Sequence, residues 1–235
     1  MHSNRMILNH QIVKIMSSKP IALFSTSKKA AHPEKFSSGL CTSFLPSGIE
    51  KTFIREVPEH QLRIAVRPFC VATDVSILFK WISQEYAGPL LARSCPPHEL
   101  EESYASMIES DFAQPFMGLV NDTPVCQMDI FRMQQDVLSL SYPARPGDYG
   151  LQLLVAPLAV QDNILLLIQT CLEYFFSFPE VGRIIVNIEE RNEYNRQLFK
   201  KAGFRSLYDI RTIYRSSSLY GCTTSHFRQL QTAIQ

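Results

Sequence analysis

The sequence has no excess of either charge: 23 lysines and arginines face 22 aspartates and glutamates, which leaves a net charge of +1. Such a balance gives no electrostatic reason to expect a nucleic-acid or membrane-surface partner. The chain also lacks an apolar run of the ~18–20 residues that span a bilayer. The longest run, 164–176, is interrupted by Gln169, Thr170 and Glu173. No apolar segment with a cleavage site follows the basic N-terminal residues, so we expect no secretory signal and a cytoplasmic protein.

The sequence contains no CxxC pair and no histidine at metal-ligand spacing from a cysteine. A disulfide framework is not expected in a chain of this length, and a zinc site has no support. We therefore expect no metal and reduced, mostly buried thiols. The six cysteines are scattered along the chain: Cys41, Cys70, Cys95, Cys126, Cys171 and Cys222.

The first fifty residues differ from the rest, because they carry turn-forming stretches at 37–39 and 45–48 and show no clear period. The length of 235 residues suits one domain with an extension, and 46% hydrophobic residues supply a core. We expect an irregular N-terminal extension at 1–50, a folded domain at 51–220 and a C-terminal tail at 221–235.

Within the domain, strand-like alternation and helical spacing predict the elements. Thr73 is the expected N-cap of a helix with Val75, Leu78 and Phe79 on one face. Residues 121–124 are typical of a hairpin turn. The predicted strands are 51–57, 63–69, 116–120, 125–131, 138–142, 151–156, 183–188 and 204–214, and the further helices begin at 96–97, 164 and 192. This order predicts an α/β or α+β domain with three layers, a mixed sheet with helices on both faces.

The last third contains the run Arg191-Asn192-Glu193-Tyr194-Asn195-Arg196-Gln197-Leu198-Phe199-Lys200-Lys201-Ala202-Gly203-Phe204. It resembles the closing signature of GNAT-type N-acetyltransferases, in which an asparagine opens a helix that ends in a Gly-Phe step. The segments 148–154, 125–131 and Gln135-Asp136, with Arg67-Pro68, resemble one branch of that superfamily. Members of this branch acylate N-hydroxylated lysine or a similar hydroxylamine in siderophore biosynthesis. The resemblance covers roughly residues 63–215.

The resemblance implies a GNAT-like, mostly antiparallel mixed sheet in which two parallel strands, here 151–156 and 183–188, splay apart. It implies a pocket between them in which acetyl-CoA binds as cosubstrate, with its pyrophosphate at the N-terminus of the next helix. The acceptor would be a small amine or hydroxylamine that attacks the thioester directly. The cofactor-binding residues implied are Leu154, Val155, Gln161, Asn163 and Asn192, and the substrate-binding residues are Gln127, Asp129 and Trp81.

Two positions depart from the family pattern. The phosphate loop is usually rich in glycine, whereas the matching positions 160–164 have none, and Asp162 would add negative charge near a phosphate. A histidine common in the siderophore branch is replaced by Gln152, which cannot accept a proton at neutral pH. Helical spacing favours a core position for Trp81 over a ligand contact.

The resemblance implies Glu189 and Gln152 as the catalytic residues, but each site residue also has a structural interpretation. Glu189 is either a general base or a solvated carboxylate. Gln152 either orients a substrate hydroxyl or is a buried, satisfied amide. Asn192 contacts pantetheine, caps its helix, or does both. Gln127 and Asp129 share one side of their strand, where they line an acceptor groove or form a polar outer face.

We expect an acyl-CoA-dependent N-acyltransferase that transfers an acetyl or short acyl group to the amine or hydroxylamine of a lysine-like siderophore precursor. Two alternatives stay open. One is a GNAT-fold binding protein that has lost catalysis, which the glycine-free loop and Gln152 favour. The other is an aminoglycoside-type N-acetyltransferase, for which the acidic residues Glu99, Glu101, Glu102 and Glu109 give only weak support.

Overall fold

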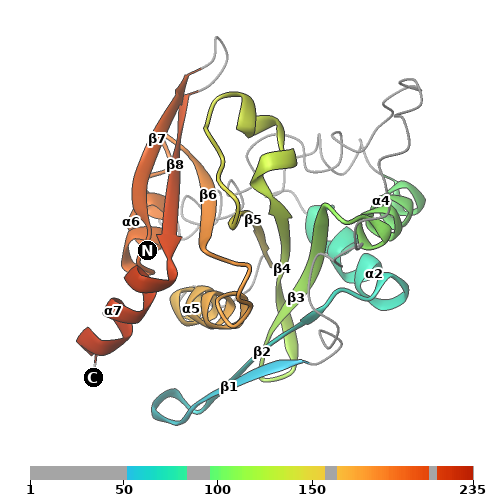
Figure 1. Cartoon of the computed structure of the whole chain (residues 1–235). Coiled ribbons are helices and arrows are strands. Elements are labelled where there is room, and N and C mark those ends of the chain that lie inside the picture. Colours follow the sequence, from blue (N-terminus) through green and yellow to red (C-terminus); the bar gives the residue numbers. More distant parts are fainter. Residues whose placement is uncertain (1–51, 84–95, 157–162, 212–215, 235) are drawn as a thin grey trace.

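The structure is a computed structural model that describes residues 52–83, 96–156, 163–211 and 216–234, so the predicted extension at 1–50 lies outside the described residues. The elements follow in chain order (Figure 1): β1 (Phe53–Val57), η1 (Pro58–His60), β2 (Leu62–Pro68), α2 (Val71–Ile82), α4 (Pro97–Glu109), β3 (Ala113–Val120), β4 (Thr123–Arg132), η3 (Met133–Gln135), η4 (Val137–Leu140), β5 (Asp148–Val155), α5 (Ile164–Phe175), β6 (Arg183–Glu189), α6 (Glu193–Lys201), β7 (Arg205–Arg211), β8 (Ser216–Thr223) and α7 (Thr224–Ile234).

The eight strands form one sheet in the order β1-β2-β3-β4-β5-β6-β8-β7. Every neighbouring pair is antiparallel except β5 and β6, which are parallel. The hairpin between β3 and β4 turns at Asn121 and Asp122, which have φ angles of 46° and 62°. A pair of positive φ angles matches the twist of adjoining strands, and Asn and Asp tolerate it best after glycine. The mixed, mostly antiparallel sheet predicted from the sequence is confirmed.

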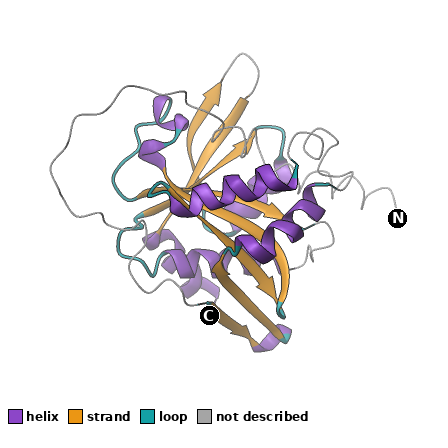
Figure 2. Cartoon of the chain, turned by 90° about the vertical axis from the view of Figure 1, so that its right-hand side faces the viewer, coloured by secondary structure: helices purple, strands orange, loops and turns teal. Residues whose placement is uncertain are grey.

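Helices cover both faces of the sheet, and the sheet separates the core into two apolar clusters. Figure 2, seen from the side of α2 and α4, shows helices lying across the strands. One cluster joins the inward residues of α2 and α4 to side chains such as Phe131, Leu154 and Ile185. The other joins α5 and α6 to the alternate positions, among them Leu153 and Val186. The period of two along each strand therefore decides which side chains face which helices.

The parallel pair separates after three residues. Asp148, Tyr149 and Gly150 pair with successive residues of β6, and the last shared pair is Gly150 with Ile185. Beyond it, β5 stays paired with β4 as far as Val155, and β6 stays paired with β8 as far as Glu189. The stretches that no longer pair with each other are 151–155 of β5 and 186–189 of β6, and we call them the splay. The splayed parallel pair expected from the resemblance is confirmed.

A buried ion pair holds the closed end of the splay. The Asp148 carboxylate accepts hydrogen bonds from Arg183 Nε at 2.8 Å, Arg183 Nη2 at 2.6 Å, the Tyr142 hydroxyl at 2.9 Å and the Arg145 N–H at 2.9 Å. Burial opposes ionisation of Asp148, but these donors outweigh it and lower its pKa. Gly147, with φ at 85°, accepts hydrogen bonds through its carbonyl from both Gly182 and Arg183 N–H groups. These contacts fix where β5 and β6 meet.

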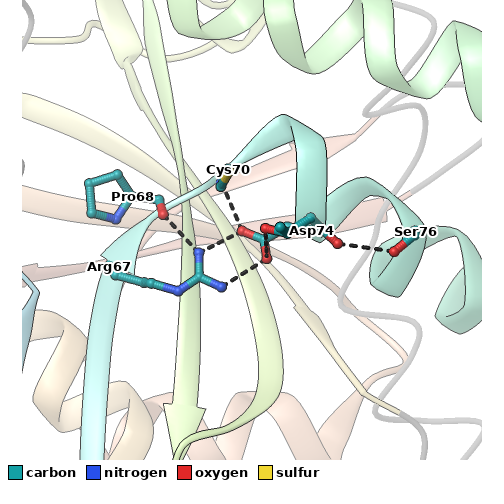
Figure 3. A network of polar contacts seen from close by, with 6 residues as sticks. Arg67, Pro68, Cys70, Asp74 and Ser76 are labelled. Carbon is teal, nitrogen blue, oxygen red and sulfur yellow. Dashed lines mark hydrogen bonds and ion pairs between the residues drawn. The ribbon is translucent and has the colours of Figure 1, made fainter.

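A second ion pair ties α2 to β2 (Figure 3). Arg67 Nη1 and Nη2 lie 2.6 and 2.8 Å from the two oxygens of Asp74, which is fully buried. The Cys70 N–H also donates to Asp74, at 2.8 Å. Burial raises the pKa of Asp74, but the Arg67 and Cys70 donors outweigh it and lower that pKa. Cys70 is the N-cap of α2, so the helix begins earlier than the expected cap at Thr73.

Two sequence predictions differ from the structure. Residues 138–142 do not form a strand: η4 lies there, begun by the Asp136 carboxylate, which accepts from Leu138 N–H at 2.8 Å. Both neighbours of β4 are already occupied by β3 and β5, so this segment cannot pair with β4 as a further strand. The expected boundary at residue 220 falls inside β8, and α7 follows it.

Candidate active site

Five polar side chains share the face of the sheet that α2 and α4 cover. Along each strand they alternate with apolar residues of the opposite face. They therefore lie on the same face as Phe131, Leu154 and Ile185, which pack in the α2 and α4 cluster. We call this set the polar row: Gln127 and Asp129 on β4, Gln152 on β5, and Asn187 and Glu189 on β6. The row therefore has members on β4 and β5, on one side of the splay, and on β6, on the other side.

Asp129 is the buried carboxyl of the row. Only 5% of its surface is exposed, and its Oδ1 accepts a hydrogen bond from Gln127 Nε2 at 2.5 Å. Burial raises its pKa from 3.8 to about 7, although the Gln127 bond acts in the opposite direction. A proton acceptor works best when its pKa lies near the pH at which it acts, as this one does near neutral pH.

Gln152 lies directly opposite Asp129 in the register of β4 and β5. Side chains in such a cross-strand pair have β-carbons ~4.5–5.5 Å apart. Gln152 is also two residues beyond Gly150, the last residue that β5 shares with β6, so it is the first row position inside the splay. The structure therefore brings together three sequence-predicted residues: Gln127, Asp129 and Gln152.

Asn187 is a member of the row that sequence reasoning missed. It is two residues beyond Ile185, as Gln152 is beyond Gly150, so the two occupy matching places on the two sides of the splay. Its Oδ1 atom is buried and has no hydrogen-bond partner among the described residues. The sequence signal was its alternation with Ile185 and Glu189 along one strand.

Glu189 ends β6 and is half-buried, in register with Ser217 of β8. Its carbonyl accepts a hydrogen bond from the Asn192 N–H at 2.9 Å. The Asn192 side chain caps α6, because its Oδ1 accepts from Asn195 N–H at 3.0 Å. The capping interpretation of Asn192 is therefore observed, while the catalytic role of Glu189 stays a prediction.

The remaining cofactor predictions concern the end of β5 and the start of α5. Leu154 and Val155 belong to the splay, with one edge paired to β4 and the other unpaired with β6. Asn163 is the N-cap residue of α5 and makes no side-chain cap with the helix. The first N–H groups of a helix are suited to an anion when no side chain caps them. Gln161 and Asp162 lie outside the described residues.

Trp81 lies in the core of the α2 and α4 cluster and is 8% exposed. The structure thus places it where helical spacing had favoured it, on the inward face of α2. The described part of the chain contains no group of three or more metal-binding side chains. Among the described helices, none is long and apolar enough to cross a membrane.

Comparison with known proteins identifies the family. The family model described as Acetyltransferase (GNAT) domain matches residues 70–212, more than half of the chain. The chain therefore belongs to the GNAT family, and it is an acyltransferase of that family.

Two curated relatives are similar to this chain in sequence, at low identity. Lysine N-acyltransferase MbtK of Mycobacterium tuberculosis is 25% identical over 166 residues, which cover 69% of this chain and 77% of the relative. N-hydroxyputrescine acetyltransferase of Acinetobacter baumannii is 22% identical over 175 residues, 74% of this chain and 84% of the relative. Both act on nitrogen acceptors, as their names state.

The fold matches a solved structure in complex with coenzyme A and kanamycin, that of aminoglycoside acetyltransferase AAC(6')-Ib. The TM-score is 0.63 at 18% identity, with 72% of this chain and 99% of the other covered. At this identity the likeness concerns the fold alone.

Proposed function

We propose that this chain transfers an acetyl or short acyl group from acyl-CoA to the side-chain nitrogen of a lysine-like siderophore precursor, in the cytoplasm where acyl-CoA is made. The observation that carries the proposal is the splay with the polar row along its edge. The splay leaves strand edges unpaired for an extended arm, and the row sets a buried carboxyl beside it. The names of the two curated relatives support a nitrogen acceptor of this size.

The residues present fit CoA in two ways. The edges of the splay supply unpaired main-chain groups, and the start of α5 supplies N–H groups for a pyrophosphate. Asn192 closes the turn between β6 and α6 through its cap. Bound acyl-CoA supplies a thioester carbonyl, and main-chain N–H groups in the splay can donate to its oxygen.

The polar row binds the acceptor and takes up its proton. The attacking nitrogen forms a bond with the acyl carbon, the carbon–sulfur bond breaks, and the nitrogen gives up one proton. Asp129 is the proton acceptor that the geometry supports best, because it is buried, faces Gln152 across the strands and has a pKa near neutrality. Gln152 and Asn187 hold the nitrogen substituents by hydrogen bonds, and Glu189 is a second carboxylate at the end of β6.

A hydroxylamine suits this row better than an alkylamine. Its conjugate acid has a pKa well below that of an alkylamine, so it is largely neutral at pH 7 and needs little help to lose a proton. Burial disfavours charge around Asp129, which penalises an ammonium group that must be desolvated. Gln152 replaces a histidine that could act as a base, and this replacement should lower the rate less for a hydroxylamine acceptor than for an alkylamine.

Release of free CoA thiol with matched acceptors tests the proposal. We expect kcat/KM with acetyl-CoA to be higher for side-chain N-hydroxylysine than for lysine, and higher for N-hydroxyputrescine than for putrescine. Kanamycin serves as the aminoglycoside comparison. A preference for kanamycin would contradict the proposed substrate class, and no thiol release with any acceptor would contradict the proposed reaction.

A further inference from the structure

The Phe131 ring lies over Gly150 at the closed end of the splay. The two residues are directly opposite each other in the register of β4 and β5, on the face that α2 and α4 cover. A β-carbon added to Gly150 would lie 2.2 to 2.9 Å from the Cζ, Cε2 and Cε1 atoms of that ring. The ring tip therefore occupies the space that a side chain at position 150 would fill, and glycine is what lets it approach the strand so closely.

This ring closes one end of the polar row. Along β4, Phe131 is two residues beyond Asp129, and along β5, Gly150 is two residues before Gln152. Ile185 of β6 lies on the other side of Gly150, as its partner in the last shared pair of the parallel strands. Phe131 and Ile185 are buried, whereas Gln152 is half-buried. The accessible part of β5 on this face therefore stops at Gln152, and the Phe131 ring fills the space beyond it.

The apolar cluster of α2 and α4 holds the Phe131 ring in place. The ring contacts Phe112, with centroids 5.9 Å apart and planes tilted by 40°. The next residue, Arg132, donates its main-chain N–H to the Phe112 carbonyl at 3.1 Å, which fixes the end of β4. Protein cores are close-packed, so a ring held in this way does not move aside for a ligand without disturbing its neighbours.

The proposed function sets the direction in which a bound acyl-CoA runs. The chain passes from Val155, at the open end of the splay, to the start of α5, where the pyrophosphate is expected. An arm that begins at that pyrophosphate runs along β5 toward Gly150. Its acyl carbonyl then comes next to Gln152 and Asp129, and any further acyl carbons point at the Phe131 ring.

We propose that Phe131 limits the length of the acyl group, so that the protein accepts acetyl-CoA and excludes longer acyl chains. This inference rests on the proposed function, because it needs acyl-CoA in the splay. Phe131 would act by its shape alone, since its side chain has no polar group and takes no part in proton transfer. One methylene that does not fit an apolar pocket typically changes the specificity constant by about tenfold or more.

Calorimetry with the full chain and no acceptor tests this limit. The ligands are acetyl-CoA and hexanoyl-CoA, and the variants are Phe131→Ala and Phe69→Ala. Phe69 is a matched control, because it belongs to the same cluster and stacks on Tyr104 at 4.5 Å, at the end of a strand that β3 and β4 separate from β5. We expect native protein and Phe69→Ala to bind hexanoyl-CoA about tenfold or more weakly than acetyl-CoA, and Phe131→Ala to bind both with similar Kd.

A second substitution refills the opened space. In Phe131→Ala, a methyl group at position 150 projects into the volume that the ring tip held, so the double variant Phe131→Ala/Gly150→Ala should again prefer acetyl-CoA. The same order should appear in thiol release with N-hydroxyputrescine. There the ratio of kcat/KM for hexanoyl-CoA to that for acetyl-CoA should rise about tenfold or more in Phe131→Ala. A variant that merely loosens the fold would not lose this gain when the methyl group is added.

The results separate the two claims. If native protein binds acetyl-CoA and hexanoyl-CoA equally well, or if Phe131→Ala keeps the native preference, the inference is wrong and the proposed function stands. The inference is also wrong if Phe69→Ala loses the preference as fully as Phe131→Ala does. If native protein binds neither ligand, the proposed function fails together with the inference. Should circular dichroism show that Phe131→Ala is not folded, Phe131→Leu, which opens less space, gives the same comparison with butyryl-CoA.

Discussion

Replacing Asp129 by asparagine should change how the stability of the protein depends on pH. The carboxyl is buried, and burial raises its pKa from 3.8 to about 7. In the unfolded chain the ordinary value applies. Between these two pKa values the folded protein holds a proton that the unfolded chain has released, so the free energy of unfolding falls as pH rises. The asparagine keeps an oxygen that accepts from Gln127 Nε2 and does not titrate.

The size of the effect follows from the two pKa values. Each pH unit between them corresponds to about 1.4 kcal/mol, so the interval from 3.8 to about 7 corresponds to about 4 kcal/mol at most. Near pH 3.5 both side chains are neutral, and native protein and Asp129→Asn should have similar stability. Above pH 7 the variant should be the more stable of the two by a few kcal/mol, on the order of that upper bound.

Urea unfolding of both proteins from pH 4 to pH 8, followed by circular dichroism, measures the difference. Asp148 and Asp74 have lowered pKa values and weaken both proteins alike as pH falls, so they cancel in the comparison. We expect the rate of acyl transfer by native protein to rise through an apparent pKa near 7, and the same variant should lose that rise. A stability difference that stays constant across the pH range would refute the assignment of a raised pKa to Asp129.

Three further predictions test other parts of the account. Glu189→Gln should lower acyl transfer by ~10²–10⁴ while CoA affinity changes little, and an unchanged turnover would make Glu189 a surface carboxylate. Asp162→Gly should tighten CoA binding in calorimetry, because it removes a negative charge from the expected phosphate loop; equal affinity would mean that the pyrophosphate binds elsewhere. Arg183→Met should lower the free energy of unfolding by ~3–5 kcal/mol, because it leaves the Asp148 carboxylate buried without its cation. Arg55→Met, which breaks a surface ion pair, should cost less than ~1 kcal/mol, and equal losses in the two variants would contradict the role given to Arg183.

The elements that carry the family signature could be predicted from sequence, because local pattern and tertiary context agree there. The apolar helix α5, the β-branched strand β6 and the amphipathic helix α6 all lie where periodicity indicated. Gly203, the glycine of the Gly-Phe step at which the resemblance ends this helix, has φ at 96°, a conformation that favours glycine. The splay itself came from the resemblance, since no local pattern reports that two strands stop pairing.

The missed elements depend on neighbours that a sequence does not show. The serine-rich start of β8 reads as a loop, but this strand is paired on both sides, with β6 and β7. Residues 137–140 carry apolar side chains but form η4 instead of a strand, and Val137 is 54% and Leu140 is 85% exposed.

The sequence predicted which face of each strand the site residues occupy, but not how buried they are or how burial shifts a pKa. Alternation placed Gln127 and Asp129 on one side of β4. It could not show that Asp129 is buried enough to titrate near neutrality, nor that the buried Asn187 Oδ1 has no hydrogen-bond partner among the described residues. Those properties arise from what the rest of the fold does or does not bring to each side chain.

Titration of native protein with acetyl-CoA by calorimetry tests the central claim most directly, since everything proposed for the splay depends on it. The account predicts saturable binding at a single site, competed by CoA and accompanied by a rise in the thermal unfolding temperature. An absence of both heat and thermal stabilisation at millimolar acetyl-CoA would contradict it, and would leave a GNAT fold that binds something other than CoA.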